Sequence, residues 1–580
     1  MSKIPSLRWS DSKRWGLPLI LVVVALALRM IGIGWGLPND KHHETFHPDE
    51  SVVWAYSQAI EPTKLQFTPG FYNYGTLYLT TLKIASDVVA GYSGGGVDPK
   101  DPDKTWRFIG KAHLAGRILS ALAGTATVLF VFLILRRLTT EFGATCGALL
   151  IAFAPAHVVH SKFQTVDILA AFFLVVSSYF ALRIIRREGY PDRLSDLRLA
   201  VLSGAFAGLS AGTKYTGILC LLTLYAVAFS VLGKAGWKAC LAATVAALVV
   251  FVLTTPGVIL DNAVFMKDFI YEMKHTSQGH GLIFEGTTSG FIFHIGNLLF
   301  GVGTILTILA ICGLGIGAAR RHLWAIGLLA FFIPYYLLIG RAEVKFIRYT
   351  FPLYLALGVG FGYVMGRAQE KAGNWHTLVG VGLFGLGGFL GGGLQSTGRY
   401  LTWTVAPDPR EQAGDYLKGQ RVSVGVPTDP WFYTPSFHPD LGRRLFVPPE
   451  LPSAIIGQYK VFSRSISALS EPAVIRYLPS NALGEIDIDS RVDWDQRLID
   501  EAKPDYIAYS TFEVEGLDRI RQSASSSPEA KSIADNARKF IDRLRKEYEF
   551  DRQYGVGQDL IHDMMYIQPT VWIWKRKAAR

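Results

Sequence analysis

The run LPLILVVVALALRMIGIGWGL, residues 17–37, decides the fold class of this chain. It is long enough to cross the hydrocarbon core of a bilayer as a helix, which takes about 20 residues. Four basic residues precede it: Lys3, Arg8, Lys13 and Arg14. Because no convincing small-x-small cleavage site follows, we expect a retained membrane span and not a signal peptide.

Similar apolar runs recur as far as Leu394, and the composition agrees with them. Apolar residues make up 50% of the 580 residues and charged residues only 18%, against about 25% in an average soluble chain. This excludes a soluble enzyme with one anchor, a fibrous protein and a disordered chain. The net charge of +11 is expected of cytoplasmic loops rich in Lys and Arg, so we predict no nucleic-acid partner. The four cysteines lie in apolar runs without metal-ligand or paired spacing, which implies no disulfide framework: Cys146, Cys220, Cys240 and Cys312.

The pattern predicts a polytopic α-helical membrane protein with about eleven transmembrane helices. They begin near Gly16, Ala112, Gly143, Val166, Leu199, Gly217, Trp237, Phe291, Leu323, Tyr349 and His376. We expect the protein to reside in the cell (inner or plasma) membrane. Because basic residues cluster in alternate loops, the positive-inside rule places its N-terminus in the cytoplasm. Residues 38–111 and 257–290 then form large outer loops.

The C-terminal residues 401–580 carry a soluble pattern after the membrane module of residues 1–400. Short β-branched or aromatic runs alternate with helical stretches such as Ala530–Tyr548, which predicts an α/β domain. The three runs are Arg421–Val426, Asp505–Tyr509 and Thr570–Trp574. The topology places this domain outside the cytoplasm, and no nucleotide-binding or zinc-protease motif occurs in it.

Ionisable residues gather at the predicted outer edge, beginning with His47-Pro48-Asp49-Glu50 after the first span. Pro48 suits a first helical turn, whose N-terminus favours ionised carboxylates. Neighbouring carboxylates on a helix point about 100° apart, so we expect one of them to face a given site. An ionised carboxylate in a dry cleft can act as a general base. The alternative is a helix cap on a solvated loop.

Further outer-edge residues lie where later spans begin or end. Asp167 follows the N-cap candidate Thr165 at the start of the fourth span, and Lys214 follows the glycine repeat Gly204, Gly208, Gly212 of the fifth. Lys345 and Arg348-Tyr349 open the tenth. Lys and Arg are usually more frequent in the cytoplasmic loops, so basic residues on the outer side are unexpected. They predict an anionic partner such as a lipid phosphate. The alternatives are a capping role for Asp167 and a snorkelling role for Lys214.

Histidines of the outer loops are candidates of lower specificity. His275 and His280 are five residues apart in a segment with the pattern of an interfacial helix, a poor metal spacing. His43 and His47, with His42 and Glu44 beside them, have a spacing that suits one metal ion. We favour exposed polar histidines and predict no metal site.

Together these motifs resemble the GT-C-type glycosyltransferases, in the branch of the protein O-mannosyltransferases and the lipid A aminoarabinose transferases. The resemblance rests on four motifs and covers most of residues 17–394. They are His47-Pro48-Asp49-Glu50, Thr165-Val166-Asp167, Gly208-Leu-Ser-Ala-Gly-Thr-Lys214-Tyr-Thr and Arg348-Tyr349-x2-Pro352. The C-terminal region lacks the β-trefoil pattern of the mannosyltransferases, which weakens a protein Ser/Thr acceptor.

The resemblance implies an inverting glycosyltransferase with a polyprenyl-phosphate-linked sugar donor and no required cofactor. Asp49, Glu50 and Asp167 map onto the reaction centre, and Lys214 and Arg348 onto the lipid phosphate. Further substrate-binding candidates on the same side are Tyr349, Lys345, His47, His275 and His280. The acceptor hydroxyl belongs to a lipid, a glycan or a protein.

Two other function classes remain open at this point. A transporter or flippase for a polyprenyl-linked substrate would carry inverted repeats and ionisable groups near the bilayer midplane. Here the charges gather at one edge, and no half-to-half symmetry is visible. A sensor or scaffold would explain the C-terminal domain but not the outer cations.

Overall fold

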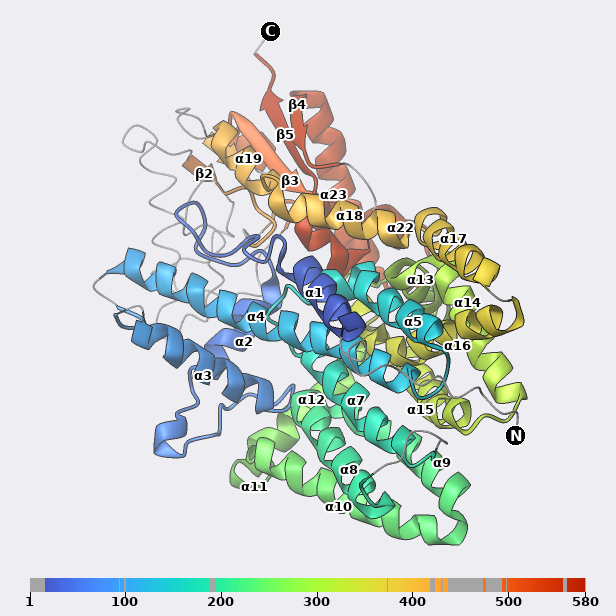
Figure 1. Ribbon diagram of the computed structural model, residues 1–580. Coiled ribbons are helices and arrows are strands. Elements are labelled where there is room, and N and C mark those ends of the chain that lie inside the picture. Colours follow the sequence, from blue (N-terminus) through green and yellow to red (C-terminus); the bar gives the residue numbers. More distant parts are fainter. Residues whose placement is uncertain are drawn as a thin grey trace.

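The structure is a computed structural model that describes residues 16–92, 94–98, 101–186, 193–372, 374–417, 423–428, 431–436, 473–475, 493–496, 498–556 and 561–578. It is mostly helical, as predicted, with one sheet built from strands late in the chain (Figure 1). The sheet and its helices lie at one end of the helical part. This arrangement brings the C-terminal region next to the start of α2 and the end of α12.

The helical part runs from α1 to α19 and includes short 3-10 helices. The first half contains α1 (Gly16–Met30), α2 (Pro48–Ser57), η2 (Pro62–Lys64), α3 (Leu77–Tyr92), α4 (Pro102–Leu135), α5 (Glu141–Phe153), α6 (Pro155–His160), α7 (Val166–Arg183), α8 (Asp196–Thr213), η3 (Tyr215–Cys220), α9 (Leu221–Leu232), η4 (Gly233–Ala235) and α10 (Gly236–Thr254). The second contains α11 (Gly257–Leu260), α12 (Asn262–Gln278), α13 (Gly290–Val302), α14 (Thr304–Ala319), α15 (Leu323–Gly340), η5 (Ile347–Leu353), α16 (Tyr354–Ala372), α17 (Asn374–Leu390), α18 (Gly393–Val405) and α19 (Pro409–Leu417).

Several of these helices are long and apolar enough to cross a membrane. Among the described residues four such segments occur: Lys104–Leu135, Val166–Arg183, Tyr215–Thr254 and Leu323–Gly340. The number rises to six if each of two bent helix pairs is one span. The multi-pass character is thereby supported, while the count of about eleven spans stays a prediction.

The helices begin close to most of the predicted positions, with two informative differences. α4 begins at Pro102 and not near Ala112, because the Asp101 carboxylate caps it by accepting the N–H of Lys104 at 2.9 Å. The run from Phe291 is not one straight helix: α13 and α14 meet at 110°. The bend falls at Gly303, whose φ of +112° ends α13, a conformation that glycine adopts without a steric penalty.

Glycines let the helices approach closely, as the repeat in α8 predicts. A Cβ on Gly204 would lie 2.1 Å from the carbonyl oxygen of Ala243 in α10, and one on Gly208 would lie 2.5 Å from that of Ala247. Gly143 of α5 meets the backbone of α16 in the same way. Small residues at such contacts allow the dense helix packing that van der Waals attraction needs in lipid.

The C-terminal region forms a five-stranded sheet in the order β2-β1-β3-β5-β4. Its elements are β1 (Ser423–Gly425), β2 (Ala473–Ile475), the π-helix η7 (Leu498–Ala502), β3 (Tyr506–Ser510), α21 (Thr511–Val514), α22 (Leu517–Gln522), α23 (Pro528–Glu547), β4 (Tyr548–Tyr554), η8 (His562–Ile567) and β5 (Val571–Arg576). β1 is parallel to β2 and β3, and β5 is antiparallel to β3 and β4. The predicted strands and helix correspond to β1, β3, β5 and α23.

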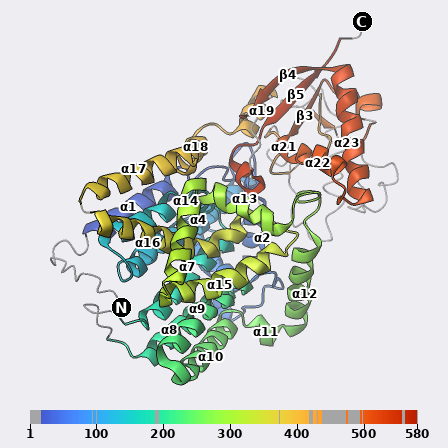
Figure 2. The same ribbon diagram turned by 90° about the vertical axis from the view of Figure 1, so that its right-hand side faces the viewer.

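Helices cover both faces of this sheet (Figure 2). Alternate residues of β3 point to opposite faces, as strand geometry requires. Ile507 and Tyr509 pack in one cluster with α22 and α23, whereas Tyr506 and Ala508 pack in another with α19. α19 therefore joins the sheet to α18 and the helical part.

We predict that Gly204→Ala lowers the melting temperature of the detergent-purified protein by several degrees. A methyl group there collides with the backbone of α10, and overpacking of this kind costs about 1–3 kcal/mol. Gly315→Ala is the matched control, because a Cβ at Gly315 meets nothing within 4 Å. Equal melting temperatures of the two variants would contradict the close contact.

Candidate active site

Asp49 lies in the first turn of α2, where the sequence pattern places it. His47 is the N-cap, and its Nδ1 accepts the N–H of Asp49 at 3.3 Å, while Pro48 occupies the first helical position. The Asp49 side chain is about one-third exposed (33%), and its Oδ2 lies 3.2 Å from Nη2 of Arg348. Burial, the largest single effect, raises the pKa of Asp49, but the charges of Arg348, His47, His280 and Lys214 together outweigh it, and the net shift is downward. Asp49 is thus an ionised, accessible carboxylate.

Glu50 points elsewhere and is fully buried. Its two carboxylate oxygens accept hydrogen bonds from Arg117 of α4, Nε to Oε1 at 2.8 Å and Nη2 to Oε2 at 2.7 Å. The N–H of Gln164 also donates to Oε1 at 2.8 Å. Burial, the largest single effect, raises the pKa of Glu50, but the charge and hydrogen bond of Arg117, with smaller effects of His47 and His113, more than offset this and lower the pKa to about 2. The neighbouring acids therefore face different partners, as the 100° step of a helix predicts.

Asp167 and Lys214 meet where α7 begins and α8 ends. Nζ of Lys214 lies 2.6 Å from Oδ1 of Asp167, whose side chain is buried. Lys214 Nζ also sits 4.4 Å from the ring centroid of Tyr349, a favourable cation–π position. Thr165 occupies the predicted N-cap position, but its hydroxyl makes no cap hydrogen bond. Asp167 and Lys214 thus form an ion pair at the junction of two helices.

Arg348, in η5, lies between Asp49 and the ion pair of Asp167 and Lys214. Its Nη2 faces Asp49 at 3.2 Å and its Nε faces Asp167 at 3.8 Å. Its guanidinium lies 3.9 Å from the ring centroid of Phe346. We call Asp49, Asp167, Lys214, Arg348 and Asp563 the charged cluster.

Asp563 is the member of the charged cluster that sequence reasoning missed. It belongs to η8 of the C-terminal region and has no solvent exposure. Its Oδ2 lies 3.8 Å from Nη1 of Arg348 and 3.7 Å from Nε2 of His160. The only sequence signal is a lone acid in His562-Asp563-Met564-Met565, which no helical or strand period singles out. Its partners are more than 200 residues away.

Lys345 and the two loop histidines lie around the charged cluster and not in it. Nζ of Lys345 donates to Thr287 and pairs with Glu343, both at 3.0 Å. It lines a cavity of about 290 Å³ together with Arg519, His562 and Asp563, the last of which belongs to the charged cluster. His280 Nδ1 and His275 Nε2 are 3.0 Å apart, and the His280 ring packs on Phe346 at 5.5 Å.

The histidines of the segment before α2 have separate partners and do not converge. His42 Nε2 lies 3.3 Å from Glu411 Oε1, and His43 stacks on Trp106 at 4.5 Å. His47 packs against Phe163 and Tyr566. Within the part of the chain that the structure describes, no group of three metal-ligating side chains occurs.

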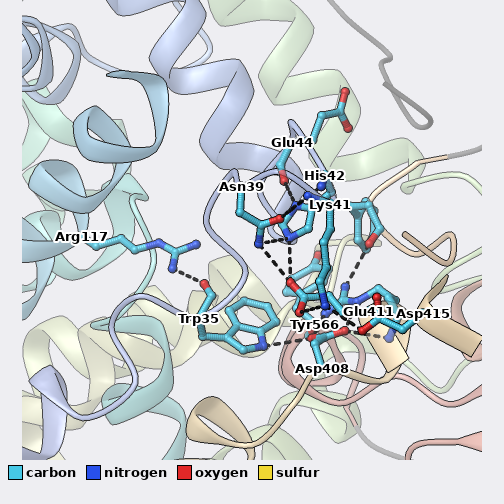
Figure 3. A network of polar contacts seen from close by, with 12 residues as sticks. Trp35, Asn39, Lys41, His42, Glu44, Arg117, Asp408, Glu411, Asp415 and Tyr566 are labelled. Atoms are coloured by element: carbon cyan, nitrogen blue, oxygen red, sulfur yellow. Dashed lines mark hydrogen bonds and ion pairs between the residues drawn. The ribbon is translucent and has the colours of Figure 1, made fainter. Parts of the chain in front are cut away.

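The segment between α1 and α2 is held to α19 by a polar network (Figure 3). Asn39 donates to Glu411 at 3.0 Å, and Lys41 donates to Asp415 at 2.7 Å. Trp35 Nε1 donates to Asp408 at 3.1 Å. The hydrogen bond from His42, the largest cause, lowers the pKa of Glu411 to about 2. This network places the start of α2, and so Asp49, beside the C-terminal region.

The chain is similar to known proteins in sequence and in fold. Residues 105–259 match the family model described as dolichyl-phosphate-mannose-protein mannosyltransferase. No curated protein matches the chain. ArnT from Cupriavidus metallidurans in the apo state is similar in structure, with a TM-score of 0.50 and 14% identity over 97% of this chain and 98% of that one. The same protein bound to undecaprenyl phosphate gives a TM-score of 0.49 and 14% identity over the same shares.

An archaeal structure is a more distant match. The oligosaccharyltransferase of Archaeoglobus fulgidus in the apo form has a TM-score of 0.45 and 14% identity, and the match covers 70% of this chain. The chain covers 58% of that protein's length. The resemblance predicted from the four motifs is confirmed by the family match and by the fold shared with ArnT. The chain is a multi-pass membrane protein that shares its fold with ArnT, and its residues 105–259 are similar to the mannosyltransferase family.

Proposed function

We propose that the protein is an inverting glycosyltransferase that moves a sugar from a polyprenyl-phosphate donor to a hydroxyl acceptor. The observation that carries the proposal is the charged cluster itself. It combines two cations, Lys214 and Arg348, with an accessible ionised carboxylate, Asp49. ArnT, which has the same fold, is known with undecaprenyl phosphate bound. The acceptor is a lipid, a glycan or a protein.

The two cations suit the phosphate of the donor. Lys214 and Arg348 line a small cavity with Asp167, and apolar residues of α7 continue its wall. Cations that face a leaving phosphate stabilise the negative charge that develops on it. In the structure these cations pair with Asp49 and Asp167. A donor phosphate therefore competes with those carboxylates for Arg348 and Lys214.

Asp49 is the proposed general base. The acceptor oxygen attacks the anomeric carbon from the face opposite the phosphate, and the bond from that carbon to the phosphate oxygen breaks. The bonding electron pair leaves with the phosphate, and the hydroxyl proton passes to Asp49. One displacement of this kind inverts the anomeric centre. Asp167 then holds Lys214 and orients the sugar or the acceptor.

Glu50 is better suited to positioning than to proton transfer. Arg117, its partner, also donates to the carbonyl oxygens of Ile33 and Trp35 in the segment after α1. The Glu50–Arg117 pair thus ties α2 to α4 and to the end of α1. We propose that it fixes the helix that presents Asp49.

His47, Tyr349, His275, His280 and Lys345 stay substrate-binding proposals with different support. His47 caps the helix of Asp49, and the Tyr349 ring contacts the ammonium of Lys214. His280 packs on Phe346 and its charge acts on Asp49, while His275 contacts His280. Lys345 lines the neighbouring cavity and is therefore placed for an acceptor and not for the donor phosphate.

Orientation and domain limits belong to the same proposal. Basic residues in alternate loops support a cytoplasmic N-terminus in the cell membrane, with the charged cluster and residues 401–580 on the extracytoplasmic side. Residues 1–400 would then be the catalytic membrane module. A transporter without chemistry is less consistent with the structure, because Asp49 and Asp563 come from segments outside the spans.

We expect Asp49→Asn and Glu50→Gln to fail in different ways. Asp49→Asn keeps the fold and the binding of undecaprenyl phosphate but lowers sugar transfer by about 10²-fold or more, as loss of a general base does. Glu50→Gln leaves the buried Arg117 unpaired, which costs about 3–5 kcal/mol. The measurements are transfer rates and melting temperatures of both variants.

The stabilising role of Glu50 predicts a pH dependence of protein stability. The pKa of Glu50 is about 2 in the folded protein, below its ordinary 4.5. Its contribution to stability is therefore present above pH 4.5 and is lost as the pH falls through 2. Near-normal transfer by Asp49→Asn, or an unchanged melting temperature of Glu50→Gln at pH 7, would contradict the assignment.

We expect Lys214→Ala and Arg348→Ala each to weaken the binding of undecaprenyl phosphate by at least about tenfold. Each removes a charge-assisted contact to the phosphate, and such contacts are worth about 1.5–3 kcal/mol. The dissociation constant of the purified protein is the measurement. Lys274→Ala is a control on the exposed side of α12. Unchanged affinity in both variants would remove the phosphate role.

A further inference from the structure

Asp563 is inserted from the C-terminal region into the charged cluster. Its Oδ1 accepts the N–H of Ile347 at 3.2 Å, and its Oδ2 accepts the N–H of Arg348 at 3.3 Å. The same carboxylate faces the guanidinium of Arg348 at 3.8 Å. It therefore holds both the backbone and the side chain of one residue of the cluster.

We propose that Asp563 is a positioning residue for Arg348 and that the C-terminal region is thereby part of the active site. The inference rests on the proposed function, in which Arg348 contacts the donor phosphate. It assigns to the C-terminal region a role that no motif in its sequence indicates.

The geometry around the guanidinium favours this role. Each of its three nitrogens faces a different carboxylate: Nη2 faces Asp49, Nε faces Asp167 and Nη1 faces Asp563. The first two carboxylates compete with a donor phosphate, so their contacts weaken when a donor binds. Asp563 is buried on the side of η8 and keeps its contact. Asp563 therefore holds Nη1 of Arg348 in place while Nη2 and Nε become free to contact the phosphate.

The charge of Asp563 depends in turn on Arg348. Burial raises the pKa of Asp563, although Arg348, His562 and the two N–H donors lower it. An unpaired carboxylate in a dry site takes up a proton or distorts its surroundings. Removing Arg348 therefore removes the largest of the effects that favour a charge at Asp563. The two residues act as a unit, and their substitutions are expected not to add.

The segment η8 is itself held in place by α19 and by the segment before α2. Arg410, which is fully buried, donates through Nη2 to the carbonyl oxygen of Tyr566 at 2.7 Å. Its guanidinium also lies 3.7 Å from the ring centroid of Phe46, just before α2. The Tyr566 ring packs on His47 at 4.6 Å. One set of contacts therefore fixes both Asp563 and the cap of the helix that carries Asp49.

A double-mutant cycle on the full-length protein tests the inference, with undecaprenyl phosphate as the probe. The variants are Asp563→Asn, Arg348→Ala and their combination. Asp535→Asn is the matched control, because Asp535 is an exposed carboxylate on α23 of the same region. We expect Asp563→Asn to weaken binding by about tenfold in the natural background and by less than about twofold in Arg348→Ala, the non-additivity of residues in contact. Asp535→Asn leaves the affinity unchanged.

Asp563→Glu and the melting temperature separate positioning from folding. Glu keeps the negative charge, and we expect this variant to fold and to recover part of the lost affinity. Equal losses of affinity in both backgrounds would show that Asp563 acts independently of Arg348 and would overturn the inference. Unfolding of both Asp563 variants while Asp535→Asn folds would show that Asp563 supports the fold alone.

The remaining outcomes distinguish the inference from the function on which it rests. If Asp563→Asn binds undecaprenyl phosphate normally while Arg348→Ala binds it more weakly, only the role of Asp563 is overturned. A natural protein that binds no undecaprenyl phosphate overturns the proposed function and the inference together.

Discussion

The buried guanidinium of Arg348 is the interaction on which the rest of the site depends. A charge removed from water needs partners, and Arg348 finds three carboxylates that come from α2, α7 and η8. These elements are far apart in the sequence, so a single side chain fixes their relative positions. Such electrostatic contacts are strong only where water is excluded. The surrounding helices and the C-terminal region provide that exclusion.

The division of labour between neighbouring residues follows from the same constraint. Asp49 and Glu50 are adjacent, yet one is accessible beside Arg348 and the other is locked against Arg117. A fully buried bidentate pair is rigid and well suited to hold a helix. A carboxylate with partial exposure can meet a substrate. Under the proposed function, α2 therefore carries one acid for the chemistry and one for its own placement.

Much of this arrangement could be predicted from local sequence. Hydrophobic runs predicted the helices, and the glycine repeat predicted the close approach of α8 to another helix, which is α10. Pro48 predicted the start of α2. The bend between α13 and α14 at Gly303 was not predicted, because a straight helix and a bent helix can have the same apolar sequence pattern. Arg117, Arg410 and Asp563 were missed because their importance lies in partners remote in the chain. No periodic pattern records such contacts.

The contribution of η8 has a consequence for biosynthesis. Asp49 leaves the ribosome long before Asp563, and chains fold progressively from the N-terminal end as they are made. The helical part can insert into the membrane long before Asp563 exists. A nascent chain that still lacks η8 therefore holds an incomplete charged cluster. Under the proposed function, competence for sugar transfer would arrive only once η8 has been synthesised and has docked.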